Sequence, residues 1–151
     1  MPGMTRWLLQ RYWRLTRGLT MGAQGIVMDA AGQVLLVRHG YHPGWHFPGG
    51  GVEFGETAEA TVIRELAEET GIVVEGAPRL LGLYAHFDTF PGDHIALFVI
   101  DRWSRPSIPK PNHEIVEQGF FPREALPEGV TAGTRQRLAE LFEGARPSAH
   151  W

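Results

Sequence analysis

The 151-residue sequence contains no cysteine, which excludes a disulfide framework and any chemistry that needs a thiolate. Its formal net charge of −3 offers no bulk attraction to nucleic acid. It has no apolar run long enough to span a membrane, and no internal repeat or low-complexity tract. A chain without cysteine suits a reducing compartment. We therefore expect a cytoplasmic protein with no stable membrane insertion and no nucleic acid polymer as partner.

The composition is that of an ordinary globular chain, with 43% hydrophobic and 21% charged residues. This length suffices for one domain with one sizeable core. We expect an N-terminal arm over residues 1–20, a domain over residues 21–144 and a C-terminal tail over residues 145–151 with little to order it.

The arm mixes aromatic and aliphatic side chains with four arginines and is predicted to be a basic amphipathic helix. Gln10 and Arg11 interrupt its apolar stretch, which argues against a secretory signal. The favoured interpretation is a helix packed over its own domain with the aromatic side inward. An arm in a homodimer and a helix on a membrane surface are the alternatives, in that order.

Apolar, β-branched segments separated by turn residues predict a sheet. Residues 22–29 and 33–38 flank a turn at residues 29–32 and are expected to form a hairpin. Further strands are expected at residues 45–47, 80–87, 94–103 and 114–121, and a second amphipathic helix at residues 134–142. This order of elements predicts an α/β (α+β) fold, in which a mixed sheet lies between helices as an α-β-α sandwich.

A run of glycines at residues 49–51 precedes the strongest helix signal in the chain. Such a run permits positive φ angles and a close approach of the backbone to a ligand. Thr57 is the expected N-cap, residues 58–69 are good helix formers, and Gly71 suits the left-handed position that ends a helix.

This predicted helix has an apolar face and an acidic face. The apolar face, expected to pack against the sheet, is formed by Val62, Ile63 and Leu66. The acidic face has carboxylates at positions i, i+3 and i+4: Glu65, Glu68 and Glu69. Like charges at these spacings cost roughly a few tenths of a kcal/mol per pair, and a bound divalent cation would reverse that cost. A solvated acidic face is the alternative.

The stretch from Gly50 to Ile72 fits G-x5-E-x7-R-E-U-x-E-E-x-G-U at every specified position, where U is aliphatic. Seven positions demand one amino acid, and at about 7% usage each a chance match is on the order of one in a hundred million. The stretch resembles the signature of the Nudix hydrolases. The resemblance implies an α-β-α sandwich and hydrolysis of a diphosphate linkage in a nucleoside diphosphate joined to another group.

The resemblance also implies a divalent cofactor, Mg²⁺ or Mn²⁺. It assigns as metal ligands the side chains of Glu65, Glu68 and Glu69 and the backbone carbonyl of Gly50. Hard cations prefer such oxygen ligands and neutralise the charge of a phosphoanhydride. Arg64, in the catalytic part of the signature, is expected to hold the glycine loop and Glu56 in place through a salt bridge rather than to contact substrate.

The helix glutamates are expected to activate a water nucleophile, and Glu68 is the favoured general base. Glu117 and Glu114 on a later segment are the other candidates, with Glu117 the better placed of the two. A solvent-facing strand position is the alternative for Glu117.

A nucleotide-type small molecule is the expected substrate. The residues expected to contact it are Arg38, His46, Tyr84 and Phe87, each with a core or surface role as the alternative. Residues 85–88 lack the proline and tyrosine that accompany ADP-ribose and dinucleoside polyphosphate substrates in the family, so the substrate stays open. A non-catalytic nucleotide-sensing domain is the alternative function, and the intact set of glutamates favours the enzyme.

Overall fold

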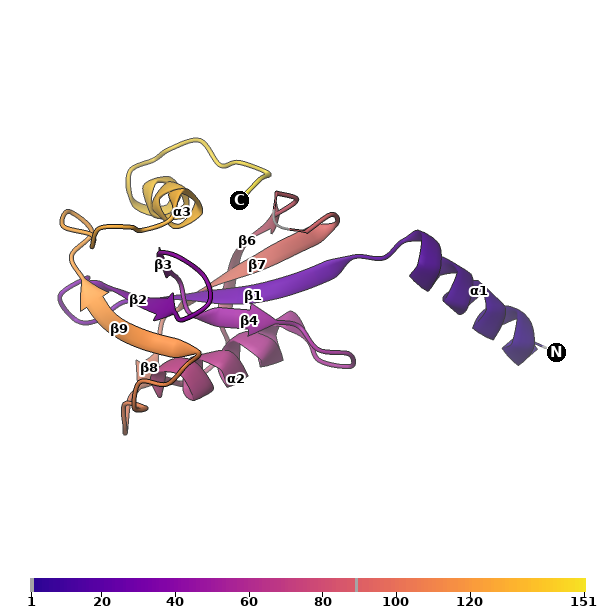
Figure 1. Cartoon of the computed structure of the whole chain (residues 1–151), viewed down its shortest axis with the longest axis horizontal. Coiled ribbons are helices and arrows are strands. Elements are labelled where there is room, and N and C mark those ends of the chain that lie inside the picture. Colours follow the sequence, from indigo (N-terminus) through magenta and orange to yellow (C-terminus); the bar gives the residue numbers. More distant parts are fainter. Residues whose placement is uncertain (1, 89) are drawn as a thin grey trace.

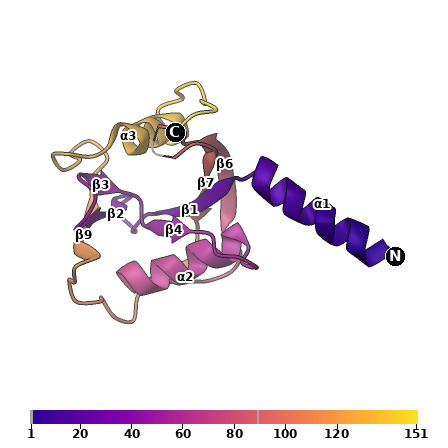
Figure 2. The same cartoon turned by 45° about the vertical axis from the view of Figure 1, so that its right-hand side comes forward.

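Two helices cover opposite faces of a mixed β-sheet in the computed structural model, which describes residues 2–88 and 90–151 (Figure 1). Helix α2 spans Ala58–Thr70 and helix α3 spans Ala132–Phe142. The sheet lies between them, as the second view also shows (Figure 2). The predicted class, a mixed sheet between helices, is confirmed.

The main sheet has four strands in the order β4-β1-β7-β6. Strand β1 (Thr20–Val27) pairs antiparallel with β4 (Gly49–Gly51) and parallel with β7 (Asp93–Ile100). Strand β7 pairs antiparallel with β6 (Arg79–Ala85). The glycine run is therefore an edge strand of this sheet, next to the strand at its centre.

A second sheet has the order β3-β2-β9, and all its pairings are antiparallel. It contains β3 (Trp45–His46), β2 (Val34–His39) and β9 (Ile115–Phe121). The short strands β5 (Val73–Val74) and β8 (Trp103–Ser104) pair with each other. The strands expected from the sequence are present at the expected places, except that β8 is separate from β7.

The predicted hairpin between the first two strands is wrong in its pairing. Both edges of β1 are occupied by β4 and β7, so β1 and β2 share only an isolated bridge between Met28 and Val34. The turn itself is confirmed, because the Asp29 carboxylate accepts hydrogen bonds from the backbone N–H groups of Ala31 at 2.9 Å and Gln33 at 2.8 Å. This side-chain bonding closes the turn, although the two strands that it connects belong to different sheets.

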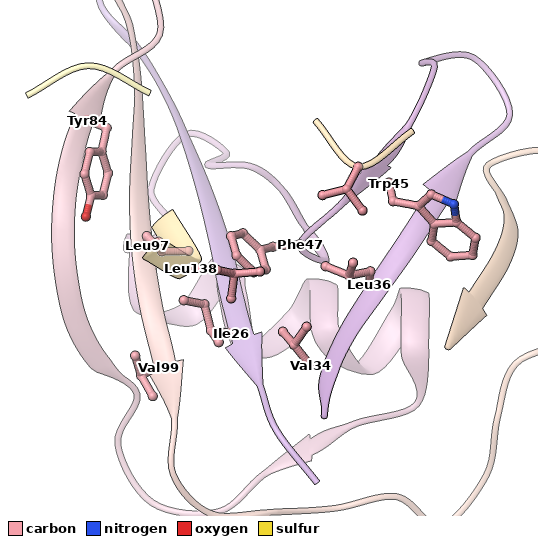
Figure 3. Packing of buried hydrophobic residues seen from close by; sticks show 10 residues of the cluster. Ile26, Val34, Leu36, Trp45, Phe47, Tyr84, Leu97, Val99 and Leu138 are labelled. Carbon is pink, nitrogen blue, oxygen red and sulfur yellow. The ribbon is translucent and has the colours of Figure 1, made fainter. Parts of the chain in front are cut away.

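Alternate residues of the central strands face the two helices, as the period of two in a strand requires. The cluster on the α2 side contains Ala23, Val27, Ala96 and Phe98. The cluster on the α3 side contains Ile26, Leu97, Val99 and Leu138 (Figure 3). Both faces of β1 and β7 are thus buried, which explains why these strands read as continuous apolar runs.

The ends of α2 follow the sequence prediction. The Thr57 hydroxyl accepts a hydrogen bond from the backbone N–H of Ala60 at 3.0 Å, and Gly71 adopts the left-handed conformation with φ 75°. Val62 and Leu66 are fully buried, as predicted, whereas Ile63 is 36% exposed and its predicted burial is wrong. A residue one position after Val62 turns about 100° away from the buried face, which puts Ile63 at its border.

The C-terminal tail is ordered by side-chain packing, so the expectation of an unordered tail is wrong. The Trp151 ring lies 5.7 Å from the Tyr84 ring and 6.3 Å from the Phe47 ring, measured between centroids. The buried guanidinium of Arg137 stacks over Tyr84 at 4.3 Å and donates to the backbone carbonyl of His150 at 2.8 Å. One aromatic residue at position 151 therefore extends the core on the α3 side.

Helix α1 (Pro2–Thr16) projects from the body instead of lying on it (Figures 1 and 2). The helix is confirmed, but the favoured packing over its own domain is wrong, because its large apolar side chains are exposed. Among the described residues, no helix is long and apolar enough to cross a membrane.

Candidate active site

Two of the expected metal ligands lie directly against the glycine strand. A Cβ built at Gly50 would lie 2.5 Å from the carboxyl carbon of Glu65, so only a glycine leaves room for this carboxylate. The carboxylate of Glu69 accepts a hydrogen bond from the backbone N–H of Gly49 at 3.0 Å. Strand β4 and helix α2 therefore bring backbone groups and carboxylates together at one edge of the main sheet.

Without a bound cation, the ionised forms of these carboxylates are disfavoured in the folded protein. The pKa of Glu69 is raised from 4.5 to about 8, mainly by burial and in addition by the charges of Glu65 and Glu114, against the opposing hydrogen bond from Gly49. Burial also raises the pKa of Glu65, although its contact with Arg64 acts in the other direction. A nearby cation is the ordinary way to hold such buried carboxylates in the charged form.

The donor chemistry of the site fits a hard divalent cation. All the candidate ligands offer oxygen atoms, which Mg²⁺ and Mn²⁺ prefer over nitrogen or sulfur. In the part of the chain that the structure describes, no three acidic or histidine side chains converge on one point as a closed metal site. Such an open arrangement suits a cation held partly by water and by substrate phosphates.

Arg64 connects the helix to the loop that follows the glycines. Its Nε and one terminal nitrogen donate to both carboxylate oxygens of Glu56, at 2.9 and 3.0 Å. The other terminal nitrogen donates to Glu65 at 2.6 Å and to Glu68 at 3.3 Å. Hydrogen bonds from Arg64 and Thr61 lower the pKa of Glu56 to about 2, so this pair stays ionised. The predicted salt bridge is confirmed, and it holds Glu65 as well as the loop.

Glu68 differs from its two neighbours in exposure. Its side chain is 61% exposed, against 13% for Glu65 and 5% for Glu69. A solvent-facing carboxylate beside two buried ones has free access to water and to a bound molecule.

The two later candidates for general base lie in different surroundings. Glu117 faces Arg38 across the β2–β9 pairing and accepts two hydrogen bonds from its guanidinium, at 2.9 and 3.2 Å. The charge of Glu114, by contrast, acts on the helix carboxylates, since it contributes to the raised pKa of both Glu65 and Glu69. The structure thus couples Glu114 to the acidic cluster and pairs Glu117 with an arginine.

A group of histidines lies beside Glu69, at the end of β2. The Nε2 atom of His39 is 4.0 Å from the Glu69 carboxylate, and the His39 ring is 5.7 Å from that of His46. The pKa of His39 is lowered from 6.5 to about 4, mainly by burial and in addition by His46 and His42, so His39 is neutral at pH 7. The contact of His39 with Glu69 joins the end of β2 to helix α2, so no local sequence pattern indicates it.

The remaining residues expected to contact substrate are dispersed. Burial lowers the pKa of His46, whose Nε2 lies 3.1 Å from the Pro43 carbonyl. Tyr84 is only 5% exposed and packs in the core on the α3 side, which favours its core role. Phe87 is 49% exposed and contacts the ring of His94 at 5.4 Å.

Sequence reasoning missed a tether at the C-terminal end of α2. The guanidinium of Arg105 donates to the backbone carbonyl of Thr70 at 2.8 Å and to the side-chain oxygen of Gln118. The Gln118 amide in turn donates to the backbone carbonyl of Glu69 at 3.1 Å. A cation at the end of a helix is favourable, and this one fixes the turn that carries Glu69 against β9.

Comparisons with known proteins agree with this arrangement. A family model described as "NUDIX domain" matches residues 18–142. A MutT-like protein of Streptomyces ambofaciens is 40% identical over 128 residues, covering 85% of this chain and 80% of that protein. An ADP-ribose pyrophosphatase of Methanocaldococcus jannaschii is 35% identical over 98 residues, covering 62% of this chain and 56% of that protein.

The crystal structure of a MutT Nudix hydrolase from Burkholderia pseudomallei has a similar fold. Its TM-score is 0.70 at 29% identity, covering 82% of this chain and 98% of that one. Matches to several other curated relatives span only 30% to 44% of their length. The chain belongs to the Nudix family of hydrolases.

Proposed function

We propose that this protein is a divalent-metal-dependent pyrophosphohydrolase that cleaves the phosphoanhydride bond of a nucleoside diphosphate linked to another moiety. The observation that carries this proposal is the contact of two carboxylates with the glycine strand, the buried one of Glu69 and the partly buried one of Glu65. A chain shaped only for stability gains nothing from two carboxylates whose ionisation is opposed by burial.

In this proposal Mg²⁺, or Mn²⁺ in its place, is held by oxygen atoms of Glu65, Glu68, Glu69 and the Gly50 backbone carbonyl. When bound, the cation neutralises phosphate charge and lowers the pKa of a coordinated water. Arg64 keeps Glu65 and the loop through Glu56 in fixed positions, so it acts as a positioning residue. Orientation of water and phosphate is most of what this reaction requires.

Glu68 is the proposed general base, because its exposed carboxylate can reach a water molecule at the open side of the helix. Glu114 is the second candidate, supported by its electrostatic coupling to the helix carboxylates. Glu117 is the weakest of the three, because two hydrogen bonds from Arg38 hold its carboxylate at 2.9 and 3.2 Å, whereas Glu68 accepts one longer hydrogen bond from Arg64 at 3.3 Å. We further propose that Arg38 and Phe87 contact the substrate, because both side chains are about half exposed.

A screen that follows the nucleoside monophosphate formed, with Mg²⁺ and with Mn²⁺, tests the proposed function. The compounds are ADP-ribose, a nucleotide sugar, a dinucleoside polyphosphate and the nucleoside triphosphates. Wild type is compared with Glu68→Gln and Glu69→Gln. A matched control is Glu59→Gln, because Glu59 lies exposed in the first turn of the same helix.

The proposal expects turnover of at least one compound by wild type and by Glu59→Gln, and a loss of at least about a hundredfold in the two site variants. Equal turnover by wild type and both site variants would contradict it. Binding of a nucleotide without turnover by wild type would favour the alternative, a nucleotide-sensing domain. The result with ADP-ribose also tests whether the absence of the proline near residues 85–88 excludes that substrate.

A further inference from the structure

Helix α1 carries two stripes on opposite sides. With about 100° per residue, the apolar side chains of one stripe fall within about 80° of one another: Met4, Leu8, Tyr12 and Leu15. The polar side chains of the other stripe occupy the opposite arc: Arg6, Gln10, Arg14 and Arg17, of which Arg17 directly follows the helix. Arg11 lies at the border of the apolar stripe, next to Met4. We call these the apolar stripe and the arginine stripe.

The apolar stripe faces away from the body. Its members are between 55% and 87% exposed, with Leu15 the most exposed of them. The contact with the body is made from the other side of the helix, where the Arg14 guanidinium lies 4.8 Å from the centre of the Phe54 ring. A continuous apolar surface of this kind marks an interaction site.

Charge is divided sharply between the arm and the rest of the chain. The first 28 residues contain four arginines and no acidic residue. The residues that follow contain ten Lys or Arg against 17 Asp or Glu. A helix whose apolar stripe lies opposite an arginine-rich one matches a surface that is apolar below and anionic above.

We propose that α1 lies on the surface of an anionic lipid bilayer, with the apolar stripe in the hydrocarbon boundary and the arginine stripe among the lipid phosphates. Trp7 and Trp13 flank the arginine stripe on its two sides, where an interfacial aromatic ring is favoured. At 15 residues the helix is too short to span a bilayer, and it can only lie along the surface.

The aliphatic side chains decide between this partner and the others. A nucleic acid would engage the arginine stripe but leave Met4, Leu8 and Leu15 in water. A second copy of the chain offers a hollow beside Leu126 and Phe142, but it is lined by Arg123 and Arg135 against one acidic residue, Glu143, and so has no net negative charge for the arginine stripe. The bilayer is the partner that satisfies both stripes at once.

Binding in this orientation keeps the candidate active site in water. Phe54 stands at the tip of the loop between β4 and α2, and it contacts the arginine side of the helix. The bilayer therefore lies on the opposite side of α1 from that loop. The protein would act on a water-soluble substrate near the membrane surface without burying its site.

Flotation of the full chain with vesicles tests this proposal. The vesicles are neutral phosphatidylcholine or phosphatidylcholine with 30 mol % phosphatidylglycerol. Four charges near an anionic surface are expected to strengthen partitioning roughly a hundredfold or more over neutral vesicles, and high salt should reduce this difference. Leu8→Glu with Leu15→Glu should abolish flotation, whereas Arg6→Gln with Arg17→Gln should remove mainly the preference for anionic lipid.

The matched control is Leu80→Glu with Leu83→Glu, two leucines of β6 that are 57% and 52% exposed on the body. This control should float like wild type, and all variants should show the far-UV circular dichroism of folded protein. No flotation of wild type with anionic vesicles at low salt would overturn the proposal. So would an unchanged flotation of the stripe variant, or a lipid-free dimer by light scattering that the stripe variant converts to monomer.

Discussion

Replacing Gly50 by alanine tests the contact that defines the candidate site. The new Cβ would lie 2.5 Å from the carboxyl carbon of Glu65 and 2.6 Å from one of its oxygens, whereas ordinary contact begins at 3.4 Å. The carboxylate must therefore move by about 1 Å, and a misplacement of that size can cost roughly a hundredfold in rate. We expect Gly50→Ala to lower kcat/KM by about a hundredfold and to weaken stabilisation by Mg²⁺.

The neighbouring glycine is a matched control for this experiment. Gly51 belongs to the same strand, its φ is not positive, and a Cβ built there meets no atom within 4 Å. Gly51→Ala should therefore keep the activity and the Mg²⁺ response of wild type. The assays are the formation of nucleoside monophosphate from the substrate found by the screen and the thermal midpoint with and without Mg²⁺. If Gly50→Ala behaves like Gly51→Ala in both assays, the proposed role of Glu65 as a metal ligand beside this strand is refuted.

Three further predictions concern the electrostatics and the core. Without metal, the free energy of unfolding should fall as the pH rises from 4.5 to about 8, because the folded chain disfavours the ionised form of Glu69. The difference between these two pKa values sets an upper limit of about 5 kcal/mol on this loss of stability. Glu69→Gln should flatten this profile in denaturant titrations, and an unchanged slope would contradict the assignment. Arg64→Lys should lower the free energy of unfolding through loss of the bidentate pair with Glu56, whereas the matched exchange Arg79→Lys, at an exposed pair with Asp101, should change it much less. Trp151→Ala should cost about 2–4 kcal/mol, and Trp7→Ala, on the exposed arm, less than about 0.5 kcal/mol; equal effects of the two would show that the tail does not stabilise the core.

The local parts of this fold could be predicted because their causes are local. The caps of α2 depend on Thr57 and Gly71, which act within a few residues of the helix ends. The salt bridge from Arg64 to Glu56 spans eight residues and follows from the helix and its preceding loop. The family signature implied that Glu65 and the backbone carbonyl of Gly50 bind the same metal ion. The sequence alone could not give the distance between these two residues.

The remaining features depend on which strands become neighbours. The parallel pairing of β1 with β7 joins segments about 73 residues apart, and it displaces β2 from the hairpin that the turn at Asp29 suggested. The positions of Glu114 and His39 beside the helix carboxylates follow from the β2–β9 sheet, which no local pattern specifies. The packing of the tail could not be predicted for the same reason. Residues 145–151 contain a single tryptophan, and nothing in them indicates that Trp151 packs against the aromatic rings of distant segments.

The ordered tail also protects an edge of the main sheet. Strand β6 is the outer strand, so its free backbone groups form a template on which another chain can add. Ala85, at the end of β6, donates to the Ala149 carbonyl at 2.8 Å and accepts from the Trp151 N–H at 2.9 Å. The last residues therefore occupy part of the edge that would otherwise invite strand addition. A chain cut before Ala149 would lose this cover next to the exposed Leu80 and Leu83, and it would be prone to aggregate through β6 even where the catalytic helix is intact.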